Sequence, residues 1–73
     1  MAVLDATGLV CPLPVLKARK LLKAMEVGEV LEVSATDPAA ARDFAAFCGA
    51  TGNQLIEQNE SEGRLFLKLK KSA

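Results

Sequence analysis

The chain has 73 residues, of which 51% are hydrophobic, and equal numbers of basic and acidic residues give it a formal net charge of zero. This composition predicts one small globular domain over residues 1–73 and excludes both a disordered chain and a protein whose whole surface binds nucleic acid. The N-terminus has no basic region followed by an apolar stretch, and no run approaches the ~18 apolar residues of a membrane span. We therefore expect neither a targeting segment nor a membrane anchor.

The first predicted elements are a strand, a helix and a second strand. A short apolar segment at residues 3–4 predicts the first strand. A helix is predicted over residues 12–26, because apolar side chains recur there at helical spacing, and Gly28 is predicted to stop it. Residues 30–36 alternate apolar with polar side chains, which is the pattern of a half-buried strand.

A second helix and a hairpin complete the predicted fold. Asp37-Pro38 indicates a helix start, because aspartate caps helix N-termini and proline fits the first helical position, and Gly49 indicates its end. Residues 54–60 and 64–70 are predicted strands joined through Ser61-Glu62-Gly63. Right-handed crossovers would place both helices on one face of a four-stranded mixed sheet. The order β-α-β-α-β-β therefore predicts a two-layer α/β sandwich of the α+β type.

Cys11 is the main candidate for chemistry. It follows Gly8-Leu9-Val10 and precedes Pro12-Leu13-Pro14, so its thiol lies where a loop meets a helix. Unpaired N–H groups and the helix dipole favour thiolate at such a place, and we predict a pKa below the ~8.5 of a free cysteine. The prolines suit a first helical turn and stiffen the loop, whereas Asp5 nearby in sequence would oppose thiolate formation. The alternative is an ordinary small apolar residue before a proline-started helix.

Other catalytic and ligand-binding arrangements are weakly supported. Without histidine there is no Cys-His pair, no histidine-activated serine and no zinc site of the usual type. Gly8 and Gly28 are isolated and form no phosphate-binding loop. Cys48 stands at helical spacing from Phe44, which predicts an inert core thiol rather than a partner for Cys11. We expect no metal and no cofactor, and the cysteine usage fits a reducing cytoplasm.

Basic residues are concentrated on the first predicted helix and the last predicted strand. They are Lys17, Arg19, Lys20 and Lys23 in the helix, and Arg64, Lys68, Lys70 and Lys71 at the strand. A basic helix beside a basic edge would suit an acidic protein surface or a phosphate backbone, and Lys17 and Lys20 are candidate docking residues. Leu9, Val10 and Leu13 are candidates for an apolar docking rim. The alternatives are a solvated helix face for the lysines and core positions for the apolar residues.

The segment from Asp5 to Leu16, with Cys11-Pro12-Leu13-Pro14 at its centre, resembles the Cys-Pro-x-Pro signature of the TusA/SirA family of small sulfur-carrier proteins. The resemblance continues through Val27-Gly28-Glu29, through residues 36–44, and through Phe47-Cys48 and Thr51-Gly52, so that it covers nearly the whole chain. It implies the two-layer sandwich predicted above. It also implies that Cys11 carries sulfur as a persulfide.

Two positions depart from the family pattern. Many members have arginine where this chain has Thr7, and many have histidine where it has Asn53. Thr7 lies beside the reactive loop. The threonine at this position therefore bears on partner recognition or on activation of the thiol.

The resemblance implies a sulfurtransferase that works as a relay. The Cys11 thiolate would attack a persulfide on a donor such as a cysteine desulfurase, and the thiolate of an acceptor protein would then take the sulfur. The family supplies tRNA thiolation, cofactor assembly and sulfur oxidation, and direct nucleic-acid binding by this neutral chain is predicted to be weak. Two other classes stay open. They are a non-catalytic interaction or regulatory module, and a thiol-redox protein that pairs Cys11 with Cys48.

Overall fold

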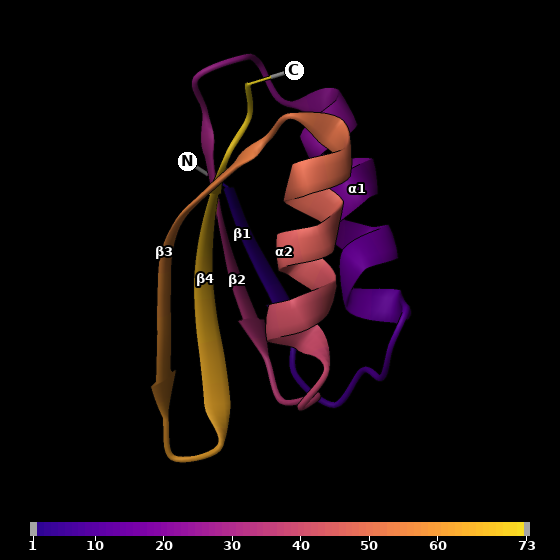
Figure 1. Ribbon diagram of the computed structural model, residues 1–73, viewed down its shortest axis with the longest axis vertical. Helices are drawn as coiled ribbons and strands as arrows, with labels where there is room; N and C mark the ends of the chain where they lie inside the picture. The colour runs from indigo at the N-terminus through magenta and orange to yellow at the C-terminus, as the bar shows by residue number, and fades with distance from the viewer. Residues whose placement is uncertain (1, 73) are drawn as a thin grey trace.

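The computed structural model describes residues 2–72 and contains the six predicted elements in the predicted order. They are β1 (Ala2–Ala6), α1 (Leu13–Ala24), β2 (Val30–Ala35), α2 (Ala40–Thr51), β3 (Gln54–Ser61) and β4 (Arg64–Lys70). Both helices lie on one side of the sheet (Figure 1). The predicted two-layer α/β sandwich is confirmed. The predicted domain also includes residues 1 and 73, which lie outside the described residues.

The sheet topology brings two loops together. The strand order is β1-β2-β4-β3, with β1 parallel to β2 and the other two neighbouring pairs antiparallel. Ala6 pairs with Ala35 at the carboxyl ends of β1 and β2. Because parallel strands end at the same edge of a sheet, the loop after β1 and the loop after β2 leave this edge side by side. The first loop contains Cys11 and the second contains Asp37.

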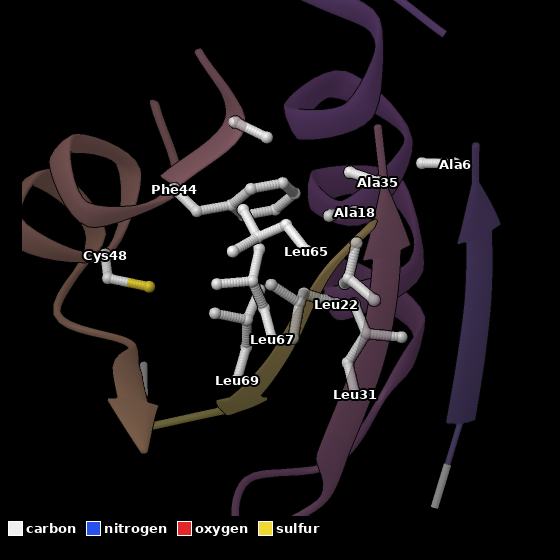
Figure 2. Close-up of a cluster of buried hydrophobic side chains, with 12 residues drawn as sticks. Ala6, Ala18, Leu22, Leu31, Ala35, Phe44, Cys48, Leu65, Leu67 and Leu69 are labelled. Atoms are coloured by element: carbon white, nitrogen blue, oxygen red, sulfur yellow. The ribbon is translucent and has the colours of Figure 1, made fainter. Parts of the chain in front are cut away.

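The core fills the space between the helices and the sheet (Figure 2). Alternate residues of β2 and β4 point into it, as the period-two pattern predicts. The buried hydrophobic side chains of the core are Ala6, Leu31, Val33, Ala35, Leu65, Leu67 and Leu69 from the sheet, and Ala18, Leu22, Ala40, Phe44 and Cys48 from the helices. Phe44 is the largest of the fully buried side chains. None of the helices within residues 2–72 has the length and apolar character needed to cross a membrane.

Helix α1 is shorter than predicted. It begins at Leu13, after Pro12 at the N-cap, and ends at Ala24, before Met25 turns to an extended conformation. Gly28 therefore lies beyond the helix and does not stop it. Instead, Gly28 has a φ of 97°, and its N–H donates to the Lys71 carbonyl at 2.8 Å, which joins this turn to the end of β4.

Helix α2 begins and ends later than predicted. One carboxylate oxygen of Asp37 accepts the Ala39 N–H at 3.1 Å, so Asp37 caps a turn and the helix proper begins at Ala40. Gly49 lies inside the helix, which continues to Thr51. Gly52 is the C-cap that follows Thr51, and its φ of 83° is the left-handed conformation that glycine commonly provides at a helix C-terminus.

Candidate functional site

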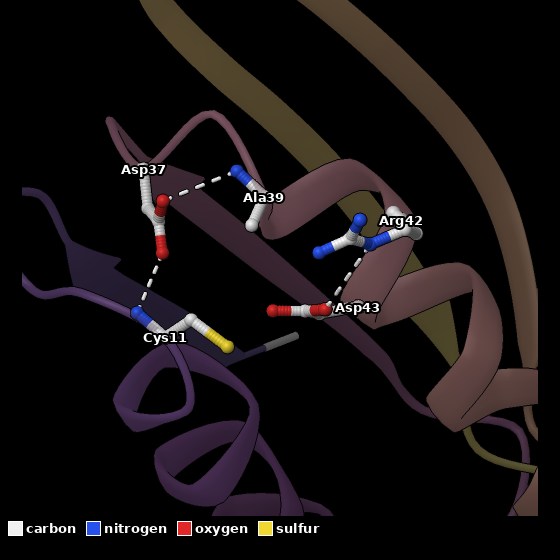
Figure 3. A network of polar contacts seen from close by, with 5 residues as sticks. All are labelled: Cys11, Asp37, Ala39, Arg42 and Asp43. Carbon is white, nitrogen blue, oxygen red and sulfur yellow. Dashed lines mark hydrogen bonds and ion pairs between the residues drawn. The ribbon is translucent and has the colours of Figure 1, made fainter.

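Cys11 lies in the loop between β1 and α1, and it is exposed. Its N–H donates to one carboxylate oxygen of Asp37 at 2.5 Å, while the other oxygen accepts the Ala39 N–H at 3.1 Å (Figure 3). The peptide bond between Cys11 and Pro12 is cis. A single carboxylate therefore joins the cysteine loop to the loop that precedes α2.

Gly8 makes a second connection between the same two loops. Its N–H donates to the Thr36 hydroxyl at 2.9 Å, and its φ of 80° is a conformation that residues with a side chain rarely adopt. Asp5 is occupied within its own turn, where it accepts the Thr7 N–H at 3.1 Å and the Thr7 hydroxyl at 2.6 Å. These bonds to Thr7 lower the pKa of Asp5. The carboxylate that acts on Cys11 is thus supplied by another part of the chain.

The pKa of the Cys11 thiol is raised, and the predicted lowering is wrong. The largest cause is hydrogen bonding to the Asp43 carboxylate, and the negative charges of Asp43 and Asp37 act in the same direction. Arg42 acts in the opposite direction but does not prevail. Figure 3 shows the Cys11 sulfur directed toward Asp43, which lies in the first turn of α2. The prediction considered the start of α1 and the nearby Asp5, but not the charged groups at the start of α2.

The start of α1 also provides fewer hydrogen-bond donors than the prediction assumed. Pro12 and Pro14 have no N–H, and the Leu13 N–H donates to the Val10 carbonyl at 2.9 Å. The unpaired N–H groups that favour a thiolate at many helix starts are thus reduced by the same prolines that identify the motif. Pro12 is exposed, whereas Pro14 is buried and packs as part of the helix.

The predicted apolar rim is partly present. Val10 and Leu13 are 65% and 42% exposed beside Cys11 in sequence. Leu9 is partly buried and packs against the core, which is the alternative position considered for it. Leu16, which the sequence analysis missed, is 50% exposed one helical turn after Leu13. Its spacing of three residues from Leu13 is the signal that could have found it.

The predicted basic surface divides into two parts. Lys17 and Lys20 are exposed on α1, as expected for candidate docking residues. However, β4 is an interior strand of the sheet and not an edge. Lys68 alternates with buried residues, so it lies on the sheet face opposite to the helices, where it pairs with Glu57 at 3.2 Å and Glu32 at 3.6 Å. The helix lysines and Lys68 therefore do not form one docking face.

Cys48 is a core residue. It is 6% exposed and lies among the buried side chains near Phe44 (Figure 2). Burial raises the pKa of its thiol, which disfavours the reactive thiolate form. Both cysteines are free thiols. A redox reaction between Cys11 and Cys48 would require Cys48 to leave the core.

Asp37, Arg42 and Asp43 are site residues that the sequence analysis did not identify. The sequence indicates that Asp37 caps a helix, and all three residues lie within the family resemblance at residues 36–44, but nothing in their spacing shows that they approach Cys11. Three surface cavities of about 210, 240 and 290 Å³ are lined by other residues than Cys11. Within residues 2–72, no group of three or more histidine, cysteine, aspartate or glutamate side chains is placed to hold a metal ion. Cys11 itself is exposed, so another protein can approach its thiol.

Comparison with known proteins identifies the family. Residues 2–71 match the family described as Sulfurtransferase TusA. A sulfur carrier protein TusA of Allochromatium vinosum is 54% identical over 69 residues, which cover 94% of this chain and 91% of the relative. A putative sulfur carrier protein of Neisseria meningitidis is 53% identical over 60 residues, or 82% of this chain and 81% of the relative.

The fold has a close counterpart among solved structures. The crystal structure of a SirA-like protein from Desulfitobacterium hafniense superposes with a TM-score of 0.88 and 28% sequence identity, and the match covers 100% of both chains. The family match and the curated relatives extend over nearly the whole sequence. The chain therefore belongs to the sulfurtransferase TusA family.

Proposed function

We propose that this protein is a sulfur carrier that holds sulfane sulfur as a persulfide on Cys11 and passes it to an acceptor protein. The observation that carries the proposal is the exposed Cys11 thiol within Cys-Pro-Leu-Pro, in a chain whose other cysteine is buried. Only a thiolate that another protein can reach is needed for this chemistry. Relatives at 54% and 42% identity are named sulfur carrier proteins.

The reaction has two displacement steps. The Cys11 thiolate attacks the outer sulfur of a donor persulfide, so that a new S–S bond forms on Cys11 while the donor bond breaks and the donor cysteine leaves as a thiolate. An acceptor thiolate then attacks the outer sulfur of the Cys11 persulfide, and Cys11 leaves as a thiolate. Neither step changes the total number of S–S bonds, so no external oxidant or reductant is consumed.

The surface around the thiol supports docking of the two partners. Val10 and Leu13 provide exposed apolar area close to Cys11 in sequence, and Leu16 extends it along α1. Lys17 lies one helical turn after Leu13 on α1, and Lys20 lies three residues after Lys17. A cysteine desulfurase in the cytoplasm is the proposed donor and a thiol protein the proposed acceptor. The supply of sulfur to tRNA thiolation, cofactor assembly or sulfur oxidation is then set by the acceptor.

A loading assay tests this proposal. Incubated with a cysteine desulfurase and cysteine, the wild-type protein should gain the mass of one sulfur atom on the peptide that contains Cys11, and a reductant should remove it. Cys11→Ser should gain nothing, because a serine hydroxyl does not accept sulfane sulfur. Intact-protein and peptide mass spectrometry measure both results.

Cys48→Ser is the matched control for the loading assay. It should load sulfur like the wild type, although a hydroxyl in the core lowers stability by about 1–3 kcal/mol. A thiol-redox protein would instead need both cysteines and would form an intramolecular disulfide. Sulfur uptake by Cys11→Ser, or no uptake by the wild type from several active donors of different kinds, would contradict the carrier function. Different donors are required because Thr7 replaces the arginine of many family members.

A further inference from the structure

We propose that Asp43 is a positioning residue that holds the Cys11 thiol in its protonated, weakly nucleophilic form while the protein is free. The proposal deepens the proposed function, since it concerns the same thiol, and it rests on that function for its biological meaning. It predicts that the Cys11 thiol reacts slowly with small alkylating and oxidising molecules between sulfur transfers. The groups that face the thiol are Asp43, Asp37 and Arg42.

The geometry places Asp43 where it can hold the thiol proton. Its carboxylate extends from the first turn of α2 toward the Cys11 sulfur, which points back at it (Figure 3). Asp37 fixes the backbone of Cys11 on one side, through the bond between the Cys11 N–H and the Asp37 carboxylate. The backbone that carries the sulfur is therefore held in place, and the carboxylate of Asp43 is the hydrogen-bond acceptor in front of the sulfur.

Asp43 cannot serve efficiently as a general base for this thiol. A carboxylate is a much weaker base than a thiolate, so the proton that the two groups share stays on sulfur. The hydrogen bond from the thiol to Asp43 thus stabilises the thiol, and loss of the proton would place a thiolate against a carboxylate. The arrangement restrains the nucleophile and does not activate it.

The neighbouring charges leave this restraint in place. Arg42 contacts the Asp43 carboxylate through a single 3.8 Å approach, and its side chain is 82% exposed. An exposed pair at this separation neutralises little charge. Both oxygens of Asp37 accept backbone N–H groups, and its charge adds to that of Asp43 at the sulfur. A partner that placed an arginine or lysine over Asp43 would remove the restraint where transfer occurs.

The test is the pH dependence of Cys11 alkylation by iodoacetamide, followed by peptide mass spectrometry from about pH 6 to about pH 10. Asp43→Asn should shift the curve to lower pH, so that the rate near neutral pH rises about tenfold for each unit by which the pKa falls. The plateau rate at high pH should stay the same, because Cys11 is fully ionised there in both proteins. A merely structural effect of Asp43 would instead change the rate by one factor at every pH.

Two control variants define the result. Asp5→Asn removes a carboxylate that accepts hydrogen bonds from Thr7, and it should leave the alkylation curve unchanged. Asp43→Glu keeps the charge and should keep the curve closer to the wild type than Asp43→Asn does. A thermal melt of each variant establishes that it is folded under the assay conditions.

The proposal is overturned if the Asp43→Asn curve superimposes on that of the wild type, moves to higher pH, or differs only in its plateau. The experiment needs no sulfur donor. If Cys11 fails to accept sulfur but the curve shifts as expected, the proposed function fails and the role of Asp43 stands. If sulfur loads and the curve does not shift, the role of Asp43 fails alone.

Discussion

Asp37 shows how strongly one side chain shapes the site. Its carboxylate accepts the N–H of Cys11, which is 26 positions away in sequence, and the N–H of Ala39. The same side chain thus caps the turn before α2 and positions the loop before α1. Because the cysteine backbone is held by a residue after β2, the geometry at Cys11 depends on correct pairing of β1 with β2.

At the residue scale, Phe44 and Phe66 offer a matched comparison. Phe44 is 0% exposed in the core, whereas Phe66 lies on the other face of the sheet and is 39% exposed. Phe44→Ala should lower the free energy of unfolding by about 3–5 kcal/mol, since it leaves a cavity in close-packed surroundings. Phe66→Ala should cost about 1–2 kcal/mol, because it buries less apolar area. Urea denaturation followed by circular dichroism measures both values.

The loss expected for Phe44→Ala is a large part of the total stability of so small a domain, which is about 5–10 kcal/mol. Phe44→Leu is therefore the second variant, and it should fall between the wild type and Phe44→Ala. Equal losses for Phe44→Ala and Phe66→Ala would contradict the burial of Phe44 in the core and the exposure of Phe66 on the other face of the sheet.

Element boundaries depend on backbone conformation as well as residue type. The turn between β3 and β4 illustrates this, because both of its central residues have positive φ, 51° at Glu62 and 77° at Gly63. Positive φ at both positions defines a type I′ turn, which matches the twist of antiparallel strands. Glycine adopts it freely, whereas glutamate does so at a cost in conformational energy.

At the element scale, we predict that Glu62→Asn stabilises the protein. Asparagine tolerates the left-handed conformation, and Asn-Gly is a preferred pair in type I′ turns, so the free energy of unfolding should rise by about 0.5–2 kcal/mol. Glu62→Gln is the control, because it removes the charge and keeps the conformational cost. Urea midpoints of the three proteins measure the difference. A gain of equal size in Glu62→Gln would assign the effect to charge and contradict the turn argument.

The distribution of charge is a property of the whole molecule. The net charge is zero. Helix α1 lies on one side of the sheet (Figure 1), whereas Arg64, Lys68 and Lys70 alternate with the buried leucines of β4 and so face the other side. Lys68 is paired with Glu57 and Glu32, and the hydrogen bond and charge of Glu57 raise its pKa. The basic residues on the helix side are those of α1 together with Lys71, which lines one surface cavity with Arg19 and Lys23. A single helix can neutralise only a few phosphates.

At the scale of the molecule, we predict that affinity for free tRNA is weak and is lost on raising salt from about 50 to about 200 mM, because binding would depend on a few phosphate contacts. Fluorescence anisotropy with labelled tRNA measures this. Lys17→Ala should reduce the slope of log K against log of the salt concentration by about one, the contribution of one phosphate contact, whereas Lys68→Ala should leave this slope unchanged. Tight binding that is nearly independent of salt would contradict the prediction.

The sequence by itself determined the order of the elements and the location of the thiol. Alternating side chains in β2 and β4 fixed which face of each strand is buried, since a period of two leaves no other choice for a half-buried strand. The position of Cys11 at a predicted helix start made it the candidate nucleophile, and the Cys-Pro-x-Pro resemblance indicated the family and the persulfide. Helix ends were less well predicted, because Gly49 and Gly52 look alike in sequence and only the backbone shows which one adopts positive φ.

Only the tertiary structure decided the electrostatics of Cys11. A helix start predicted a lowered pKa, but parallel pairing of β1 with β2 brings the loop of Asp37 and the first turn of α2, with Asp43, against the sulfur. Short-range patterns in sequence carry the propensities of one helix or strand. They do not carry distances between groups on different elements, and a pKa depends on those distances because Coulomb and hydrogen-bond energies fall steeply with separation.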